Sequence, residues 1–234
     1  MRFPTGGPFL EFNFYWADVA EEDAFARLVA ALLALGAVFR RSDITSTDDL
    51  EERLTDPHRS LFQVFMEGAT NTTRGVAEVI TYITIPEDVA RHDYRPIAIW
   101  TEGQWTEEWQ HETKARLQRA RTTGRRAKER FCALIDRTRP SYAAITVEGA
   151  LPTPYQLRRK HDGRAFHDFY VSGSYIGPAA LASVTDLFAD AYVEPVADGV
   201  YVSCWTVLNP RGKGLTTGVD GKKAAVARYI AAAR

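Results

Sequence analysis

The residues best suited to chemistry lie between positions 158 and 168. His161, His167 and Asp168 bring two imidazoles and a carboxylate into one short segment, where they could transfer protons on an anionic or phosphorylated small molecule. Their spacing fits none of the standard metal-ligand motifs, so we expect no metal site and no cofactor. Arg158 and Arg159 make the segment basic, and a solvated basic loop before an ordinary strand is the competing interpretation.

Two further segments match catalytic motifs only in part. Residues 210–223 are rich in Gly and Lys, but Thr216 stands where a phosphate-binding loop requires its first Gly, and Lys223 stands where it requires Ser or Thr. Ser172 and Ser174 lie in a stretch without the Gly-x-Ser-x-Gly pattern of a nucleophile elbow. The first segment is interpreted as a mobile loop, and the second as a strand end followed by a helix.

Two predicted strands each carry a face that mixes polar and aromatic side chains. If both strands belong to one sheet with helices behind it, these faces form an open platform suited to a protein partner. An RNA-binding platform also requires a strand with basic and aromatic residues, and the strand predicted at 76–85 offers only Tyr82. The predicted partner-binding residues are Glu11, Asn13, Tyr15, Arg158, Arg159, Phe166, Asp168 and Tyr170.

The order of the predicted elements indicates an α+β fold. Alternating apolar residues predict a strand at 9–16, and helical spacing predicts a helix at 18–38. The remaining elements of the first half are an acidic insertion near 42–60, a hairpin of strands at 76–85 and 95–101, a helix at 106–137 and a strand at 142–147. With the insertion set aside, residues 1–148 follow the βαββαβ order of a ferredoxin-like unit.

Residues 149–234 repeat much of this order. The predicted elements are a strand at 165–172, a helix at 178–191, a hairpin of strands at 192–196 and 200–208, and a short helix at 222–232. We therefore expect two ferredoxin-like halves in one compact unit. The halves either pack against each other or share one antiparallel or mixed sheet.

The helix predicted at 106–137 is long enough to join the two halves, because it approaches about 50 Å at about 1.5 Å per residue. The middle of its apolar face consists of small residues, because Gly124 lies at helical spacing from Ala120 and Ala127. We therefore predict one unbroken helix. The other faces are expected in water; alternatively they bind nucleic acid in a salt-dependent manner. Their basic residues are Lys114, Arg116, Arg119, Arg121, Arg125, Arg126, Lys128 and Arg130.

Composition is that of a globular protein, with 45% hydrophobic and 25% charged residues. No apolar run reaches the roughly 20 residues of a membrane helix. The start of the chain lacks an apolar leader, and Cys132 and Cys204 lie in different elements, so we expect a cytoplasmic protein without disulfides. Charge is uneven: residues 1–100 hold 9 Lys and Arg against 16 Asp and Glu, whereas residues 101–234 hold 20 against 14.

Two strings of residues carry a family resemblance: FLEFNFYW at 9–16 and YVEPVADGVYVSCW at 192–205. With the overall order of elements, they resemble small bacterial immunity proteins of polymorphic toxin systems. That family consists of cytosolic α+β proteins that each bind and block one toxin. The resemblance implies inhibition by surface complementarity without catalysis, and it carries over no functional residue.

The predicted function is that of a non-catalytic protein-binding module, with a toxin as the specific partner that the resemblance implies. Two alternatives stay open. One is an enzyme that acts on an anionic or phosphorylated small molecule through the region of His161, His167 and Asp168. The other is nucleic-acid binding through the basic helix, which the net charge of −1 does not favour.

Overall fold

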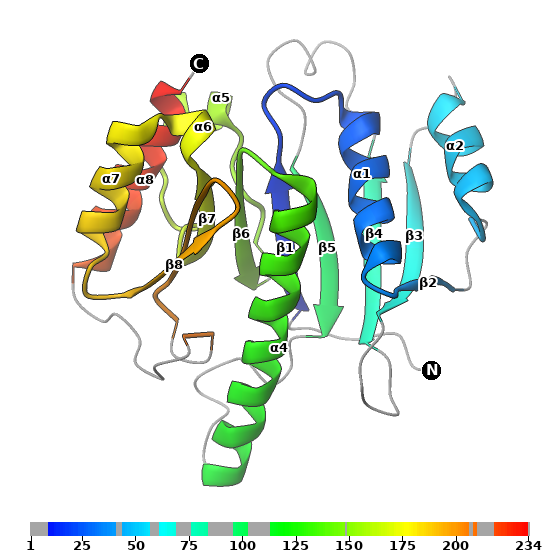
Figure 1. Ribbon diagram of the computed structural model, residues 1–234, viewed down its shortest axis with the longest axis horizontal. Helices are drawn as coiled ribbons and strands as arrows, with labels where there is room; N and C mark the ends of the chain where they lie inside the picture. Colours follow the sequence, from blue (N-terminus) through cyan, green and yellow to red (C-terminus); the bar gives the residue numbers. More distant parts are fainter. Residues whose placement is uncertain are drawn as a thin grey trace.

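The structure is a computed structural model that describes residues 9–40, 44–56, 61–68, 76–83, 96–102, 113–147, 149–205, 208–209 and 218–233. Its core is one nine-stranded sheet with the order β2-β3-β4-β5-β1-β6-β7-β9-β8, in which every recorded strand pair is antiparallel. The first strand of the sequence therefore lies at the centre of the sheet (Figure 1).

The first part of the chain supplies six strands and three of the described helices. They are β1 (Phe9–Tyr15), α1 (Glu21–Ala34), β2 (Val38–Phe39), α2 (Thr47–Thr55), β3 (Leu61–Gly68), β4 (Val76–Ile83), β5 (Ile97–Glu102), α4 (Lys114–Thr138) and β6 (Tyr142–Val147). Three acidic residues occupy the first turn of α1, where the helix dipole favours negative charge. Ser46 caps α2 by accepting a hydrogen bond from the Asp49 backbone N–H.

The second part contains shorter elements. They are α5 (Pro154–Arg159), β7 (Asp168–Ser172), α6 (Gly173–Ile176), α7 (Pro178–Leu187), β8 (Tyr192–Val196), β9 (Gly199–Ser203) and α8 (Val219–Ala232). The helix α5 begins with a capping box, in which Thr153 and Gln156 each bond the backbone of the other. Pro154 and Pro178 occupy first-turn positions that need no N–H donor.

Helices cover the two faces of the sheet unequally. Side chains of α1, α2 and α4 pack with Phe12, Phe14 and Tyr201 in one apolar cluster. Side chains of α5, α7 and α8 pack with alternate strand residues, such as Phe169 and Val202, in a second cluster on the opposite face. Figure 1 shows α5, α7 and α8 gathered at the end of the sheet that holds β7, β9 and β8. No described helix is both long enough and apolar enough to cross a bilayer.

The helix α4 is continuous through the Thr122-Thr123-Gly124 segment, as predicted, and Gly124 is buried. Residues 106–112 of the predicted helix lie outside the described residues. The ring of Phe131 contacts Phe12 and Phe14 of β1 at centroid distances of 5.6 and 5.5 Å, and Tyr201 of β9 at 6.0 Å. One aromatic side chain of α4 therefore touches strands on both sides of β6.

The basic faces of α4 are only partly in water, which corrects the prediction for Lys128. This residue is 9% exposed and forms an ion pair with Glu194 of β8. Arg130 donates a hydrogen bond to the Leu35 carbonyl oxygen at the end of α1. Arg125 and Arg126 are exposed. Part of the positive charge thus fastens α4 to the fold.

The predicted α+β class with an antiparallel sheet is confirmed, and so is the pairing of the strands predicted at 76–85 and 95–101. The strand predicted at 165–172 begins later, at Asp168, because residues 164–167 form a turn. The division at 148 and the ferredoxin-like nature of each half stay predictions. The loop predicted at 210–223 lies outside the described residues as far as position 217.

Candidate functional site

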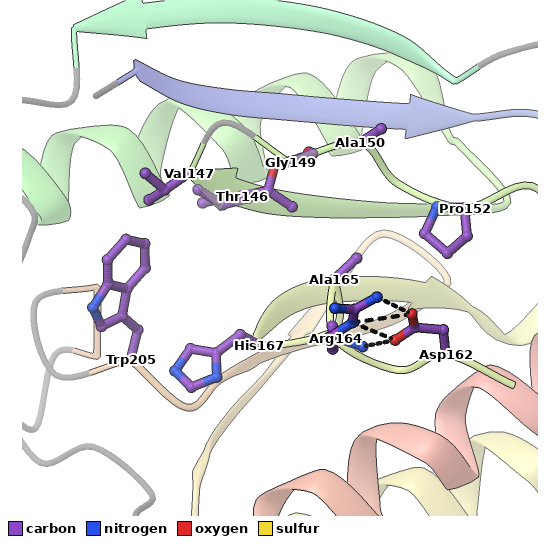
Figure 2. Close-up of a pocket in the computed structure, with 11 residues that line it drawn as sticks. Thr146, Val147, Gly149, Ala150, Pro152, Asp162, Arg164, Ala165, His167 and Trp205 are labelled. Carbon is purple, nitrogen blue, oxygen red and sulfur yellow. Dashed lines mark hydrogen bonds and ion pairs between the residues drawn. The ribbon is translucent and has the colours of Figure 1, made fainter. Parts of the chain in front are cut away.

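A groove of about 460 Å³ opens where β6 and β7 separate, beyond their last register pair, Ile145 and Asp168. One wall is formed by Thr146 and Val147 at the end of β6 and by Gly149, Ala150 and Pro152 of the following segment. The other wall is the turn from Asp162 to His167, and Trp205 closes one end (Figure 2). The groove therefore lies between the loop that follows β6 and the turn that precedes β7.

The first wall is held in place by a small polar network. The side-chain amide of Asn13 donates to the Thr146 hydroxyl oxygen at 2.9 Å, and the Thr146 hydroxyl donates to the Gly149 carbonyl oxygen. Asn13 is 2% exposed, so its amide is satisfied inside the fold and is not presented to a partner. A central-strand side chain thus sets the path of the loop that forms the wall.

The second wall carries a charged pair. The Arg164 guanidinium donates from Nε to both carboxylate oxygens of Asp162 at 3.0 Å and from Nη2 to Oδ2 at 2.7 Å. These hydrogen bonds lower the pKa of Asp162 to about 2. The adjoining Gly163 lies against the backbone of α8, where a Cβ would come within 2.3 Å of the Lys223 carbonyl carbon. The turn is therefore shaped both by its ion pair and by α8.

His167 and Trp205 form the aromatic end of the groove. Their ring centroids are 6.2 Å apart with planes at 76°, an edge-to-face arrangement. The Cys204 backbone N–H donates to the His167 carbonyl oxygen at 3.0 Å, which fixes the two chain segments relative to each other. Figure 2 shows these two rings at one end and the Asp162–Arg164 pair at the other.

A row of paired positions leads from the groove across the sheet. Thr146 pairs with Glu11, Glu11 with Trp100, Trp100 with Val79, and Val79 with Phe65. Glu11 alternates along β1 with Leu10 and Phe12, which face α1 and α4, so the row lies on the opposite face. Trp100 is 36% exposed there. We call Phe65, Trp100, Glu11 and Thr146, with the groove residues His167 and Trp205, the ledge; Trp205 also packs against the first apolar cluster, so it lies at the end of the groove where the two faces of the sheet meet.

The predicted open platform is wrong in its geometry. Asn13 and Tyr15 are buried, and the Tyr15 ring lies 5.0 Å from that of Tyr142 inside the second apolar cluster. Phe166 precedes the strand and is buried; Asp168 and Tyr170 are buried as well. Asp168 and Tyr170 also face the α4 side, opposite to Glu11, so the two sets do not share a surface. Of the strand residues predicted for the platform, Glu11 alone is not buried.

The candidate catalytic residues His161, His167 and Asp168 do not converge on one site in the structure. His161 is exposed and lines an adjoining cavity of about 410 Å³ with Lys160 and Lys223, on the other side of the Asp162–Arg164 pair. His167 lines the groove, whereas the side chain of Asp168 is fully buried on the α4 side. Because the His167 side chain lines the groove and the Asp168 side chain is buried, the two side chains do not meet at one point on the surface.

Arg158 and Arg159 are exposed at the end of α5, and the Arg159 guanidinium lies 5.8 Å from the Tyr155 ring centroid. Their partner-binding role stays a prediction. Within the described residues, no group of three His, Cys, Asp or Glu side chains is placed to hold a metal ion.

Trp100 and Trp205 are the site residues that sequence reasoning missed. The signal for Trp100 was its alternation with the buried residues Ile97 and Ile99, which puts it on the other face of its strand. Nothing local in the sequence indicates that Trp205 lies beside His167, because the two meet only through the pairing of β7 and β9.

Comparison with known proteins identifies no family. No protein-family profile and no curated protein matches the chain. One solved structure, described as a Pseudomonas aeruginosa T6SS protein, aligns over 95% of this chain and 81% of its own, with a TM-score of 0.42 and 8% sequence identity. Similarity at this level assigns neither a family nor a function to the chain.

Proposed function

We propose that the chain is a non-catalytic protein-binding module and that its partner docks on the ledge. The observation that carries this proposal is the register row that joins the half-exposed Trp100 to the groove of His167 and Trp205 across β5, β1 and β6. Tryptophan is enriched among the residues that dominate binding energy, because its large ring excludes water when a partner covers it. A flat aromatic face that ends in a groove suits a protein surface with one projecting side chain.

Polar groups along the ledge would orient such a partner. Glu11 lies between Trp100 and Thr146, and the Asp162–Arg164 pair borders the far end of the groove. Charges at the rim of an interface contribute more to orientation and association rate than to affinity. The aromatic residues are therefore expected to supply the binding energy and the charged ones the selectivity.

In its specific form the proposal is that the partner is a toxin and that the chain blocks it in the cytoplasm as an immunity-type inhibitor. Support for this form comes from the resemblance of the segments 9–16 and 192–205 to such inhibitors. Those segments coincide with β1 and with the β8–β9 hairpin, so the likeness concerns the frame that holds the ledge.

The test is affinity capture with a tagged full chain, using the product of the neighbouring gene as the first candidate partner. Trp100→Ala and Trp205→Ala should each weaken binding at least about tenfold, the usual effect of truncating a dominant interface residue. Val38→Ala, which truncates an exposed apolar residue of the edge strand β2, is the matched control and should bind normally. Undiminished binding by both folded tryptophan variants would overturn the proposal.

We further propose that each half of the sheet is a ferredoxin-like unit. The first half places its strands in the order β4-β5-β1-β6, and the second places β7, β9 and β8 in the corresponding order beside β6. An experimental structure in which β5 does not pair with β1 would contradict this interpretation.

A further inference from the structure

Asp168 is an unusual residue next in sequence to the groove residue His167. It is fully buried, although it directly follows His167. The Tyr201 hydroxyl donates to its Oδ1 at 3.1 Å, and the backbone N–H of Trp205 is directed at the same carboxyl group. The carboxyl group therefore contacts the backbone of Trp205, and Asp168 is next to His167 in the chain; Trp205 and His167 are both aromatic residues of the ledge.

The hydrogen bonding of this carboxyl group is incomplete. Asp168 Oδ2 is buried without a hydrogen-bond partner, and so is the hydroxyl oxygen of Ser203. Ser203 is the register partner of Asp168 on β9 and lies near the carboxyl group, but outside normal hydrogen-bond geometry. A neutral carboxyl can place its proton on Oδ2, whereas a carboxylate in this arrangement has a buried, charged oxygen that accepts no hydrogen bond.

We propose that Asp168 is a positioning residue whose protonation state sets the placement of His167 and Trp205, so that partner binding at the ledge responds to pH. The effect on partner binding rests on the proposed function, whereas the effect of Asp168 on the placement of His167 and Trp205 does not. With a neutral carboxyl the groove has the form described above. Ionisation requires water beside Oδ2, and the partly exposed Trp205 segment is where the groove gives water access. Trp205 therefore moves when Asp168 loses its proton.

Few other groups around Asp168 change charge near neutral pH. Burial raises the pKa of Asp168 itself well above its usual value. Burial also raises the pKa of Tyr201 well above its usual value, and it raises the pKa of Cys204 and of Cys132 on α4 to about 12. Lys128 of α4, above the Tyr201 ring, has a pKa raised from an already high value through its bond to Glu194, against the effect of burial. His167 is another ionisable side chain beside the groove, and the variant His167→Phe controls for it.

The test is ¹⁹F NMR of the full chain labelled with 5-fluorotryptophan, titrated from about pH 5 to about pH 9. Trp205→Phe assigns the resonance of Trp205, and the resonance of the buried Trp16 serves as the internal control. We expect a single-proton transition at Trp205, which Asp168→Asn abolishes and His167→Phe retains. A transition that survives in Asp168→Asn, one that disappears in His167→Phe, or none at all in the wild type would overturn the inference.

Tyr201→Phe is the second variant, because it removes the donor to Oδ1 that favours the charged form. The Trp205 transition should then move to higher pH, and a move to lower pH would count against Asp168. Partner capture at both ends of the titration separates the two proposals. If the transition is present but Trp205→Ala still binds the partner normally, the proposed docking surface is wrong and the role of Asp168 stands. If the partner binds the ledge with an affinity that does not depend on pH and no transition is found, the docking surface stands and the role of Asp168 is wrong.

Discussion

Asp198 shows how one exposed carboxylate can organise several elements. It accepts hydrogen bonds from the hydroxyls of Tyr170 at 2.8 Å, Ser172 at 2.6 Å and Ser174 at 2.7 Å. Burial raises its pKa, but these donors outweigh that effect and hold the pKa below its usual value of 3.8. Ser172 and Ser174 therefore have a structural explanation, since they join the β8–β9 turn to the start of α6.

Asp198→Ala should lower the free energy of unfolding by about 1–2 kcal/mol, because three hydroxyl donors lose their acceptor. A lowered pKa in the folded state stabilises the fold above pH 3.8, and this stabilisation is lost as the pH falls below that value. Urea unfolding at about pH 7 and about pH 3 measures both effects. Asp136→Ala, which removes only an exposed pair with Arg139, is the control and should change stability little.

Protonation of Asp168 affects stability in the opposite direction from protonation of Asp198. Its pKa is raised in the folded state, so the folded chain binds a proton more tightly than the unfolded chain, and stability falls as the pH rises above 3.8. Asp168→Asn should therefore raise the free energy of unfolding at about pH 7 by about 1 kcal/mol and should flatten its dependence on pH. Equal slopes of stability against pH for the variant and the wild type would show that Asp168 ionises inside the fold without cost.

At the scale of elements, Lys128 fastens α4 to the edge of the sheet. Its ammonium group pairs with Glu194 of β8 and lies 5.0 Å from the Tyr192 ring centroid and 5.7 Å from that of Tyr201. Tyr192 also donates to the same Glu194 oxygen at 2.6 Å. A partly desolvated cation held by a carboxylate and two aromatic faces is costly to leave unpaired.

Glu194→Ala should destabilise the chain by about 1–3 kcal/mol, because Lys128 stays buried without its anion. Adding Lys128→Met should recover part of that loss, since the methionine has no charge to solvate. Thermal unfolding of the two single variants and the double variant tests this coupling. Asp190→Ala, which breaks an exposed pair with Lys222, is the matched control, with an expected loss below about 1 kcal/mol.

The contact between the Asp162–His167 turn and α8 depends on a missing side chain. A Cβ on Gly163 would lie within 2.3 Å of the Lys223 carbonyl carbon. Gly163→Ala should therefore cost about 2–3 kcal/mol and displace one wall of the groove. Gly221→Ala is the control, because nothing lies within 4 Å of its added Cβ inside α8, and it should stabilise the helix by about 0.5–1 kcal/mol. Denaturant midpoints of the two variants should move in opposite directions.

At the scale of the whole molecule, the sheet runs without interruption from β2 to β8. The pairing of β6 with β7 crosses the expected boundary at 148, and α4 contacts both β1 and β9. We expect one cooperative unfolding transition, with tryptophan fluorescence and circular dichroism changing together. Two separated transitions would show that residues 1–148 and 149–234 are independent units.

The charge imbalance between the two halves survives folding. The ion pairs recorded between described residues, such as Arg40–Glu67, lie within residues 1–100 or within residues 101–234; Lys128–Glu194 is one of the latter and crosses the expected boundary at 148. Residues 1–100 and 101–234 are joined by strand pairing, by apolar packing and by hydrogen bonds such as that from Arg130 to the Leu35 carbonyl oxygen.

Local patterns in the sequence predicted most elements but misplaced the site. Alternation located the strands, yet in β7 every residue from Asp168 to Ser172 is buried, because α4 covers one face and α7 and α8 the other. A strand that is buried on both faces has no solvent-exposed face, so an alternating pattern cannot identify one. Asp168 was predicted to be exposed because its side chain is polar, but it is buried with the rest of β7. The neighbours Glu11 and Trp100 are set by register across 89 positions of sequence, which no local pattern contains.

The central position of β1 has a consequence for synthesis. It is the first described strand to leave the ribosome, but its two neighbours in the sheet, β5 and β6, are made much later. Until then, the apolar row of Leu10, Phe12 and Phe14 has no strand beside it. Such non-local pairing slows folding and exposes nascent chains to aggregation. Slower translation before β6 should therefore lower the soluble yield, and a chaperone that holds β1 should restore it.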